Sequence, residues 1–230
     1  MKIEEIFTKK AAQLGIKLST LQLTKFKQYC DLLKEVNQLY NLTSIMDEEG
    51  IYIKHFLDSI TLLEWVDVKN KRILDIGTGA GFPGIPLKIV ESNTDVVLLD
   101  SNHKKIEFLK NLIHQLELKG ISTQYSRVED YLPNQSFDLV TSRAVAKLSI
   151  LFELSYPKLK VGGTMVAYKG EKYKEELEGS EALFKNLGIS YDIKKASLDS
   201  MSHYLILFKK SIDGNLKSRN YAQMMKNPLW

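Results

Sequence analysis

The sequence has almost no cysteine, since Cys30 is the only one among its 230 residues. A single thiol can form neither an intrachain disulfide nor a multi-cysteine metal site, which favours a reducing compartment. The first residues lack the apolar run of a signal peptide, and no stretch approaches the roughly 20 apolar residues of a membrane-spanning helix. The four histidines are scattered. We therefore expect a cytoplasmic protein with no membrane contact and no metal.

An excess of charge is also missing from most of the chain. The net charge is +4, and basic and acidic residues balance outside residues 201–230. That last stretch carries the whole excess of positive charge. It has one acidic residue, Asp213, and five basic residues, Lys209, Lys210, Lys217, Arg219 and Lys226. A basic end of this kind is either a solvated surface or a contact for a polyanion such as RNA.

The first 66 residues have a helical pattern, with apolar residues spaced three and four apart. Ser19 or Thr20 is a plausible N-cap for a second helix, and the segment from Asp47 to Val66 predicts another helix. We divide the chain into a helical extension packed on the body (1–66), a body (67–210) and a basic tail (211–230).

After Lys71 short apolar runs alternate with amphipathic stretches, the pattern of βαβ units. The predicted strands are Arg72–Ile76, Val96–Asp100, Ser122–Tyr125, Phe137–Thr141, Thr164–Tyr168, Ser190–Lys194 and Tyr204–Phe208. The predicted helices are Gly84–Glu91, Asn102–Leu118, Val145–Leu159 and Glu171–Leu187. We therefore expect an α/β protein with a doubly wound, Rossmann-like, mostly parallel seven-stranded sheet. Such a sheet binds its ligand at the carboxyl ends of its strands.

A loop rich in glycine follows the first predicted strand. Asp75 precedes Gly77, Gly79, Gly81 and Gly84, a density that indicates a ligand lying against the main chain. The spacing also fits a dinucleotide fingerprint, with Asp100 as its acidic residue. However, a carboxylate at position 75 suits the ammonium group of S-adenosylmethionine (AdoMet) and would repel a pyrophosphate. Pro83 and Pro86 also remove amide donors from the helix start, which disfavours phosphate.

Two further segments end predicted strands at the same edge. Asp100 can accept hydrogen bonds from two ribose hydroxyls; its alternative role is an N-cap, for which Ser101 and Asn102 are also available. Residues 126–130, including Val128 and Glu129, follow the third strand and either run along the adenine edge or form a solvated turn.

Arg143 follows the fourth strand, where methyltransferases acting on exocyclic amines carry an Asn/Asp-Pro-Pro-aromatic turn that is missing here. Its planar guanidinium suits a carboxylate, a phosphate or a purine edge, so we expect Arg143 to position substrate or cofactor. A ring nitrogen such as guanine N7 needs positioning and no deprotonation. The alternative for Arg143 is a structural ion pair with Glu153, Glu129 or Asp130. His55 has either a packing role or a site role.

The joint pattern resembles the RsmG (GidB) family of bacterial 16S ribosomal RNA methyltransferases over nearly the whole length. The matching segments are Tyr40–Ser44, His55–Ser59, Asp75–Leu87, Leu98–Ser101, Ser126–Glu129 and Ser142–Ala144. The resemblance implies AdoMet-dependent methylation of guanine N7 at position 527, in the 530 loop of 16S rRNA. It also implies AdoMet contacts by Gly77, Phe82, the Val128–Glu129 backbone and Arg143.

The carboxyl end departs from the family in part. Ser218 stands where many members have proline, while Arg219, Lys226 and Pro228-Leu229 keep the family spacing. We expect Arg219 and Lys226 to bind RNA, either free or within the small ribosomal subunit, and the protein to act as a monomer. Two other functions use the same loop: a nicotinamide-nucleotide-dependent oxidoreductase, and a nucleotide-binding module without chemistry.

Overall fold

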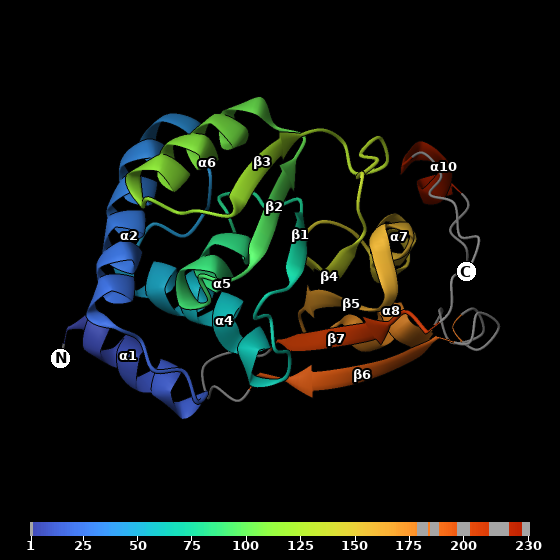
Figure 1. Ribbon diagram of the computed structural model, residues 1–230, viewed down its shortest axis with the longest axis horizontal. Coiled ribbons are helices and arrows are strands. Elements are labelled where there is room, and N and C mark those ends of the chain that lie inside the picture. Colours follow the sequence, from blue (N-terminus) through green and yellow to red (C-terminus); the bar gives the residue numbers. More distant parts are fainter. Residues whose placement is uncertain (1, 179–183, 185–188, 197–202, 212–220, 227–230) are drawn as a thin grey trace.

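The computed structural model describes residues 2–178, 184, 189–196, 203–211 and 221–226, and all structural statements below concern these residues. They form a central sheet with helices on both faces (Figure 1). Within this part of the chain no helix has the length and apolar character needed to cross a membrane. The same residues contain no group of three or more His, Cys, Asp or Glu side chains placed to hold a metal ion.

The sheet has seven strands in the order β3-β2-β1-β4-β5-β7-β6. They are β1 (Arg72–Ile76), β2 (Asp95–Asp100), β3 (Ile121–Tyr125), β4 (Phe137–Arg143), β5 (Leu159–Lys169), β6 (Ser190–Lys195) and β7 (Tyr204–Lys209). The pairs among β1 to β5 are parallel, and β7 is antiparallel to both β5 and β6. The predicted mostly parallel, seven-stranded sheet is confirmed.

The central strands are buried on both faces, because each face carries its own apolar core. In β1, Ile73 belongs to the core on one face, whereas Leu74 and Ile76 belong to the core on the other. The same alternation occurs in β2 between Val96 and Val97. Successive strand residues point to opposite faces, so covering both faces requires a continuous apolar run.

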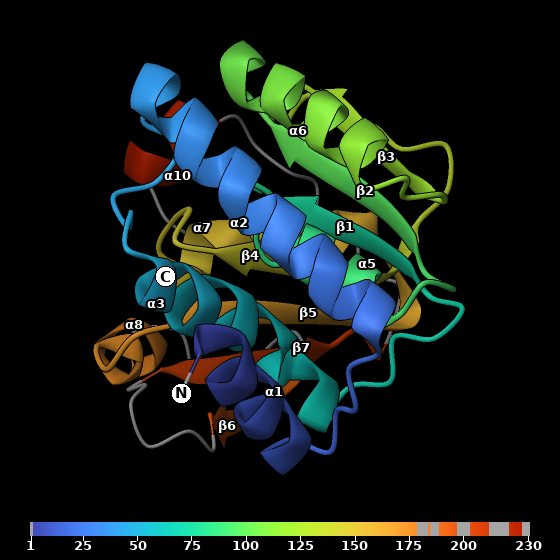
Figure 2. The ribbon, with the colours of Figure 1, turned by 90° about the vertical axis from the view of Figure 1, so that its left-hand side faces the viewer.

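One face is covered by α1 (Ile3–Gln13), α2 (Thr20–Tyr40), α5 (Gly84–Val90) and α6 (His103–Gln115). Figure 2 shows α2 lying across the middle of this face. On the other face lie α7 (Leu148–Ser155), the 3-10 turn η3 (Tyr156–Lys158) and α8 (Tyr173–Glu178). The short helix α10 (Tyr221–Lys226) packs on α7 through Met224, which contacts Ile150 and Leu154.

The N-terminal helices share the core of the sheet. Phe7 of α1, Phe26 of α2 and Phe56 form edge-on and tilted aromatic contacts with ring centroids 4.9 to 6.4 Å apart. Ser19 is the N-cap of α2 and forms a capping box with Gln22. It is one of the two residues that the sequence predicted for this cap. Phe56 and Tyr29 also contact Phe82, with ring centroids 6.0 and 5.4 Å apart, so this aromatic cluster reaches the glycine loop.

The single helix predicted for 47–66 is irregular in the structure. It is divided into α3 (Glu48–Gly50), the π-helix η1 (Ile51–Leu57), α4 (Asp58–Ile60) and the 3-10 turn η2 (Thr61–Glu64). A π-helical turn widens the helix and often occurs at functional sites. Here it carries His55, and Asp58 follows it directly.

Other expectations need correction or lie outside the described residues. The predicted helix Val145–Leu159 begins only at Leu148. In the predicted helix Glu171–Leu187, the described residues that are helical are Tyr173–Glu178 and residue 184. Lys210 is not part of a solvated basic end, because it is 3% exposed and its Nζ donates to the Leu159 carbonyl at 3.0 Å. Lys217 and Arg219 lie outside the described residues.

Candidate functional site

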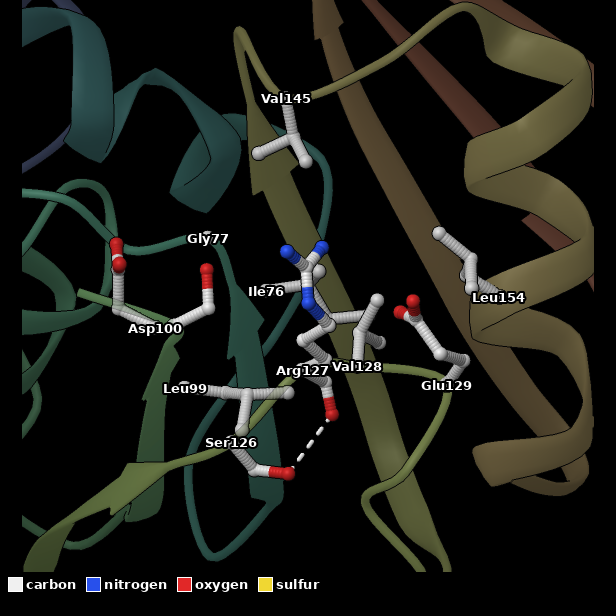
Figure 3. A pocket seen from close by; sticks show the side chains of 11 residues that line it. Ile76, Gly77, Leu99, Asp100, Ser126, Arg127, Val128, Glu129, Val145 and Leu154 are labelled. Atoms are coloured by element: carbon white, nitrogen blue, oxygen red, sulfur yellow. Dashed lines mark hydrogen bonds between the residues drawn. The ribbon is translucent and has the colours of Figure 1, made fainter. Parts of the chain in front are cut away.

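A cavity of about 170 Å³ lies at the carboxyl ends of β1 and β2 and beside the segment after β3. We call it the first cavity. Figure 3 shows its labelled lining residues, which come from the ends of β1 and β2, from the segment after β3, from the segment before α7 and from α7 itself. They include Gly77, Asp100, Ser126, Arg127, Val128, Glu129, Val145 and Leu154. Four of the residues expected to bind the cofactor thus meet around one hollow, at the edge that the sheet topology predicts.

Gly77 is the glycine of the loop that borders this cavity. Its φ is 62°, a left-handed conformation, and a Cβ placed on it would lie 2.4 Å from Cγ2 of Val145. No other residue type fits both conditions without moving the chain. The segment after β4 therefore approaches the main chain of the glycine loop closely at this point.

Asp75 does not face a ligand, contrary to the sequence-based expectation. Its carboxylate is fully buried and accepts hydrogen bonds from Thr78 Oγ1 (2.6 Å), the Gly84 amide (2.9 Å) and Thr141 Oγ1 (3.2 Å). Thr141 is its register partner on β4. Burial raises the pKa of Asp75 to about 6, against the lowering effect of these bonds. Asp75 thus holds the two ends of the glycine loop together from beneath.

Asp100 ends β2 and is held in one orientation at the cavity wall. Its Oδ2 accepts from the Gly79 amide at 2.9 Å, and its Oδ1 accepts from the Asn102 amide at 2.8 Å. The N-cap of α6 is Asn102, whose side chain accepts from the amides of Lys104 and Lys105. The N-cap alternative for Asp100 is therefore wrong, and its carboxylate borders the first cavity.

Arg143 forms an ion pair, but with a partner that the sequence did not indicate. Its NH1 donates to Asp58 Oδ2 at 2.8 Å and to the Lys54 carbonyl at 3.2 Å. The expected partners were Glu153, Glu129 and Asp130. The actual partner comes from the N-terminal segment, 85 residues earlier in the chain. Asp58 Oδ1 lies against Nε2 of His203, so the carboxylate stands between an arginine and a histidine.

His55 belongs to the same network. Its Nδ1 lies 3.1 Å from NH2 of Arg143, and its Nε2 lies 2.8 Å from Thr43 Oγ1. A guanidinium can only donate, so Nδ1 is the acceptor and Nε2 carries the proton. Burial and the neighbouring arginine charge lower the pKa of His55 from 6.5 to about 4. His55 is therefore neutral at physiological pH and serves as an acceptor for Arg143.

Phe82 connects this network with the glycine loop. Its ring stacks on the imidazole of His55 at 4.5 Å and on Tyr29 at 5.4 Å. The guanidinium carbon of Arg143 lies 4.9 Å from the centre of the same ring, a cation–π contact.

Four residues expected to bind the cofactor do not line the first cavity: Asp75, Gly79, Gly81 and Phe82.

A second cavity, of about 370 Å³, borders Arg143 and Ala144 at the end of β4. The next residue, Val145, lines the first cavity, so consecutive residues after β4 border the two hollows. The other lining residues of the second cavity are Asp58, Tyr168, Lys169, Gly170, Glu176 and His203. No local pattern indicates Tyr168, Glu176 or His203, because each has ordinary neighbours in the sequence and comes to border the cavity only through the fold.

The first cavity combines a carboxylate with exposed main chain. It offers a fixed carboxylate at Asp100 for hydroxyl donors, and main chain that lacks a side chain at Gly77. The sheet order, with β7 inserted antiparallel between β5 and β6, also differs from the order 3-2-1-4-5-6 of dinucleotide-binding sheets. Fold and site together define a class I AdoMet-dependent methyltransferase.

Solved structures support this class through the fold alone. A putative S-adenosyl-L-methionine-dependent methyltransferase from Methanococcus maripaludis gives a TM-score of 0.58 at 17% identity, covering 82% of this chain and 95% of that one. A methyltransferase from Pyrococcus furiosus gives 0.57 at 20% identity, covering 80% and 98%.

The family follows from sequence comparison. Residues 22–202 match the family model described as rRNA small subunit methyltransferase G. Relatives named ribosomal RNA small subunit methyltransferase G are 38% identical in Exiguobacterium sibiricum (98% of this chain, 99% of the relative) and 40% in Acetivibrio thermocellus (100% and 98%). The chain belongs to this family, as its sequence motifs predicted. Neither the oxidoreductase nor the module without chemistry is supported.

Proposed function

We propose that this enzyme transfers the methyl group of AdoMet to N7 of a guanine in 16S ribosomal RNA. The guanine is the one at position 527, in the 530 loop. Family membership supports the reaction and the RNA. The observation that carries the cofactor assignment is the first cavity, where the end of β2 and the glycine loop meet. An rRNA substrate also supports a cytoplasmic enzyme, which we propose acts as a monomer on RNA that is free or in the small subunit.

The residues around the first cavity take different parts in binding. Asp100 accepts hydrogen bonds from the ribose hydroxyls, and the backbone of Val128 and Glu129 follows the adenine. The main chain at Gly77 borders the amino acid end. Arg143, on the wall of the second cavity, positions cofactor and substrate. Gly79, Gly81 and Phe82 shape the loop, and Asp75 braces it.

The reaction needs positioning more than acid–base chemistry. AdoMet supplies an electrophilic methyl group on a sulfonium sulfur, and guanine N7 has a lone pair with no proton to remove. The protein must therefore hold N7 in line and tolerate a positively charged product. The neutral form of His55 fits this demand, because it adds no further positive charge beside Arg143.

A direct test is to map 7-methylguanosine in 16S rRNA from cells with and without the gene. We expect one modified guanine, at position 527, to lose its methyl group when the gene is deleted. In parallel, AdoMet should raise the melting temperature of the purified protein through linkage, and NADH should not. An unchanged methylation pattern would reject the substrate, and a thermal response to NADH alone would reject the cofactor.

We also propose that the basic end contacts the RNA backbone through Arg219 and Lys226. Lys226 is exposed at the end of α10, and α10 packs on α7 beside Leu154, which lines the first cavity. Replacing both residues by alanine should weaken RNA binding and flatten its salt dependence, with AdoMet affinity unchanged. Lys9→Ala with Lys17→Ala, exposed lysines of the N-terminal part, is the matched control. An unchanged salt slope in the tail variant would reject the contact.

A further inference from the structure

The second cavity lies where a methyl acceptor must be placed. It is bordered by the carboxyl ends of β4 and β5; Arg143 and Ala144 line it, and the next residue, Val145, lines the first cavity. A methyl donor in the first cavity and an acceptor in the second would therefore meet beside Arg143. We infer that the second cavity takes the guanine base, and that Glu176 recognises the base through its N1–H and 2-amino donors. This inference rests on the proposed function.

The charges around this cavity match the edges of guanine. Guanine presents two adjacent donors, N1–H and the 2-amino group, next to the acceptor O6; adenine presents an acceptor at N1 instead. A carboxylate accepts from both guanine donors, and a cation donates to O6. The cavity carries two carboxylates, Asp58 and Glu176, and two cations, Arg143 and Lys169. N7 adjoins O6 on the side away from the two donors, so binding by these donors leaves N7 accessible.

Of the two carboxylates, Glu176 is better placed to recognise the guanine donors. Asp58 is buried and its oxygens are engaged by Arg143 and His203. The side chain of Glu176 is 27% exposed. Its Oε2 accepts from the Leu148 amide at 2.6 Å and from Lys169 Nζ at 2.7 Å. These two donors orient the carboxylate on the wall of the cavity.

Aromatic rings complete the wall. Tyr168 is held by a hydrogen bond from its hydroxyl to the Ser59 carbonyl at 2.7 Å, and its ring centroid lies 6.5 Å from that of His203. Both residues border the cavity. A fixed aromatic wall beside polar groups is the arrangement by which proteins bind unstacked RNA bases.

The experiment combines one enzyme variant with one altered base. Inosine lacks the 2-amino group of guanine but keeps N7, so RNA with inosine at the target position removes one of the two donors. Methyl transfer is measured as kcat/KM for wild type, Glu176→Gln and Glu175→Gln, on guanine and on inosine RNA. Glu175 is an exposed neighbour on α8 and serves as the matched control.

We expect wild type and Glu175→Gln to lose roughly tenfold or more on inosine RNA, the range for a hydrogen bond to a charged group. Glu176→Gln should lose a similar factor on guanine RNA and almost nothing further on inosine RNA. Equal inosine penalties in wild type and Glu176→Gln, or no penalty in wild type, would overturn the assignment. If wild type methylated no guanine RNA at all, the proposed function would fail instead. Calorimetry with AdoMet shows whether Glu176→Gln retains the cofactor site.

Discussion

Replacing His55 by glutamine should change how stability depends on pH. In the fold, His55 accepts from Arg143 and donates to Thr43, so it stays neutral and its pKa is lowered to about 4 from 6.5. In the unfolded chain the imidazole takes up a proton at its ordinary pKa. The unfolded state therefore binds more protons between these two values, and stability is lost as pH falls through that window.

The size of the effect follows from the two pKa values. Linkage between 6.5 and about 4 makes the contribution of His55 about 2 kcal/mol smaller near pH 5 than near pH 7. Glutamine keeps a donor and an acceptor but does not titrate. Part of the wild-type loss of stability on acidification should therefore disappear in His55→Gln, whatever the variant's stability at neutral pH.

Urea unfolding near pH 5 and near pH 7 gives, for each protein, the change in the free energy of unfolding between the two pH values. The effect of His55 is the difference between the change in wild type and the change in His55→Gln. His114→Gln is the control, because His114 is exposed on α6. NMR titration of the imidazole should also show the proton on Nε2 and no protonation until well below pH 6. The reasoning is refuted if His55→Gln and wild type lose the same stability on acidification.

Three further changes test the loop and its support. The free energy of unfolding of Asp75→Asn should rise by about 2 kcal/mol relative to that of wild type as pH rises from about 4 to about 7. The reason is that the pKa of Asp75 is raised to about 6, so the wild-type protein must ionise a buried carboxyl in this range. Urea unfolding across that range measures the difference. Gly77→Ala should abolish AdoMet binding in calorimetry and lower stability by about 1 kcal/mol or more, since its Cβ would meet Val145; Val145→Ala in the same chain should restore part of the stability. Asp58→Ala should destabilise by about 3 kcal/mol in urea unfolding, because it leaves the half-buried guanidinium of Arg143 without its carboxylate; a loss below 1 kcal/mol would contradict the role given to this pair.

The sheet could be predicted because its signal is local. Ile73 and Leu74 pack into different cores, so the strand needs apolar residues at successive positions, and such a run is visible in the sequence. The prediction is weaker where a strand leaves the core. β5 begins at Leu159, five residues before the predicted start, and residues 160–162 within it are exposed. These exposed residues near the start of β5 have no apolar pattern from which a strand could be predicted.

The site could be predicted only where it depends on backbone. The sequence places Gly77 and Asp100 at one edge of the sheet, because a glycine loop and an acidic strand end have fixed positions in this fold, and both line the first cavity. The partner of Arg143 could not be found, because nothing near residue 143 or residue 58 indicates which distant charges meet. The orientation of Asp75 was mistaken for a similar reason, since the hydroxyls of Thr78 and Thr141 that turn it inward are ordinary residues in sequence.

The ion pair between Asp58 and Arg143 has a consequence for exchanging parts between relatives. A hybrid that joins residues 1–66 of one relative to the remainder of another keeps both partners, because Asp58 and Arg143 lie in segments that match the family. A chain without residues 1–66 would instead leave the guanidinium of Arg143 without its carboxylate at the second cavity. The first 66 residues therefore supply part of the wall of that cavity.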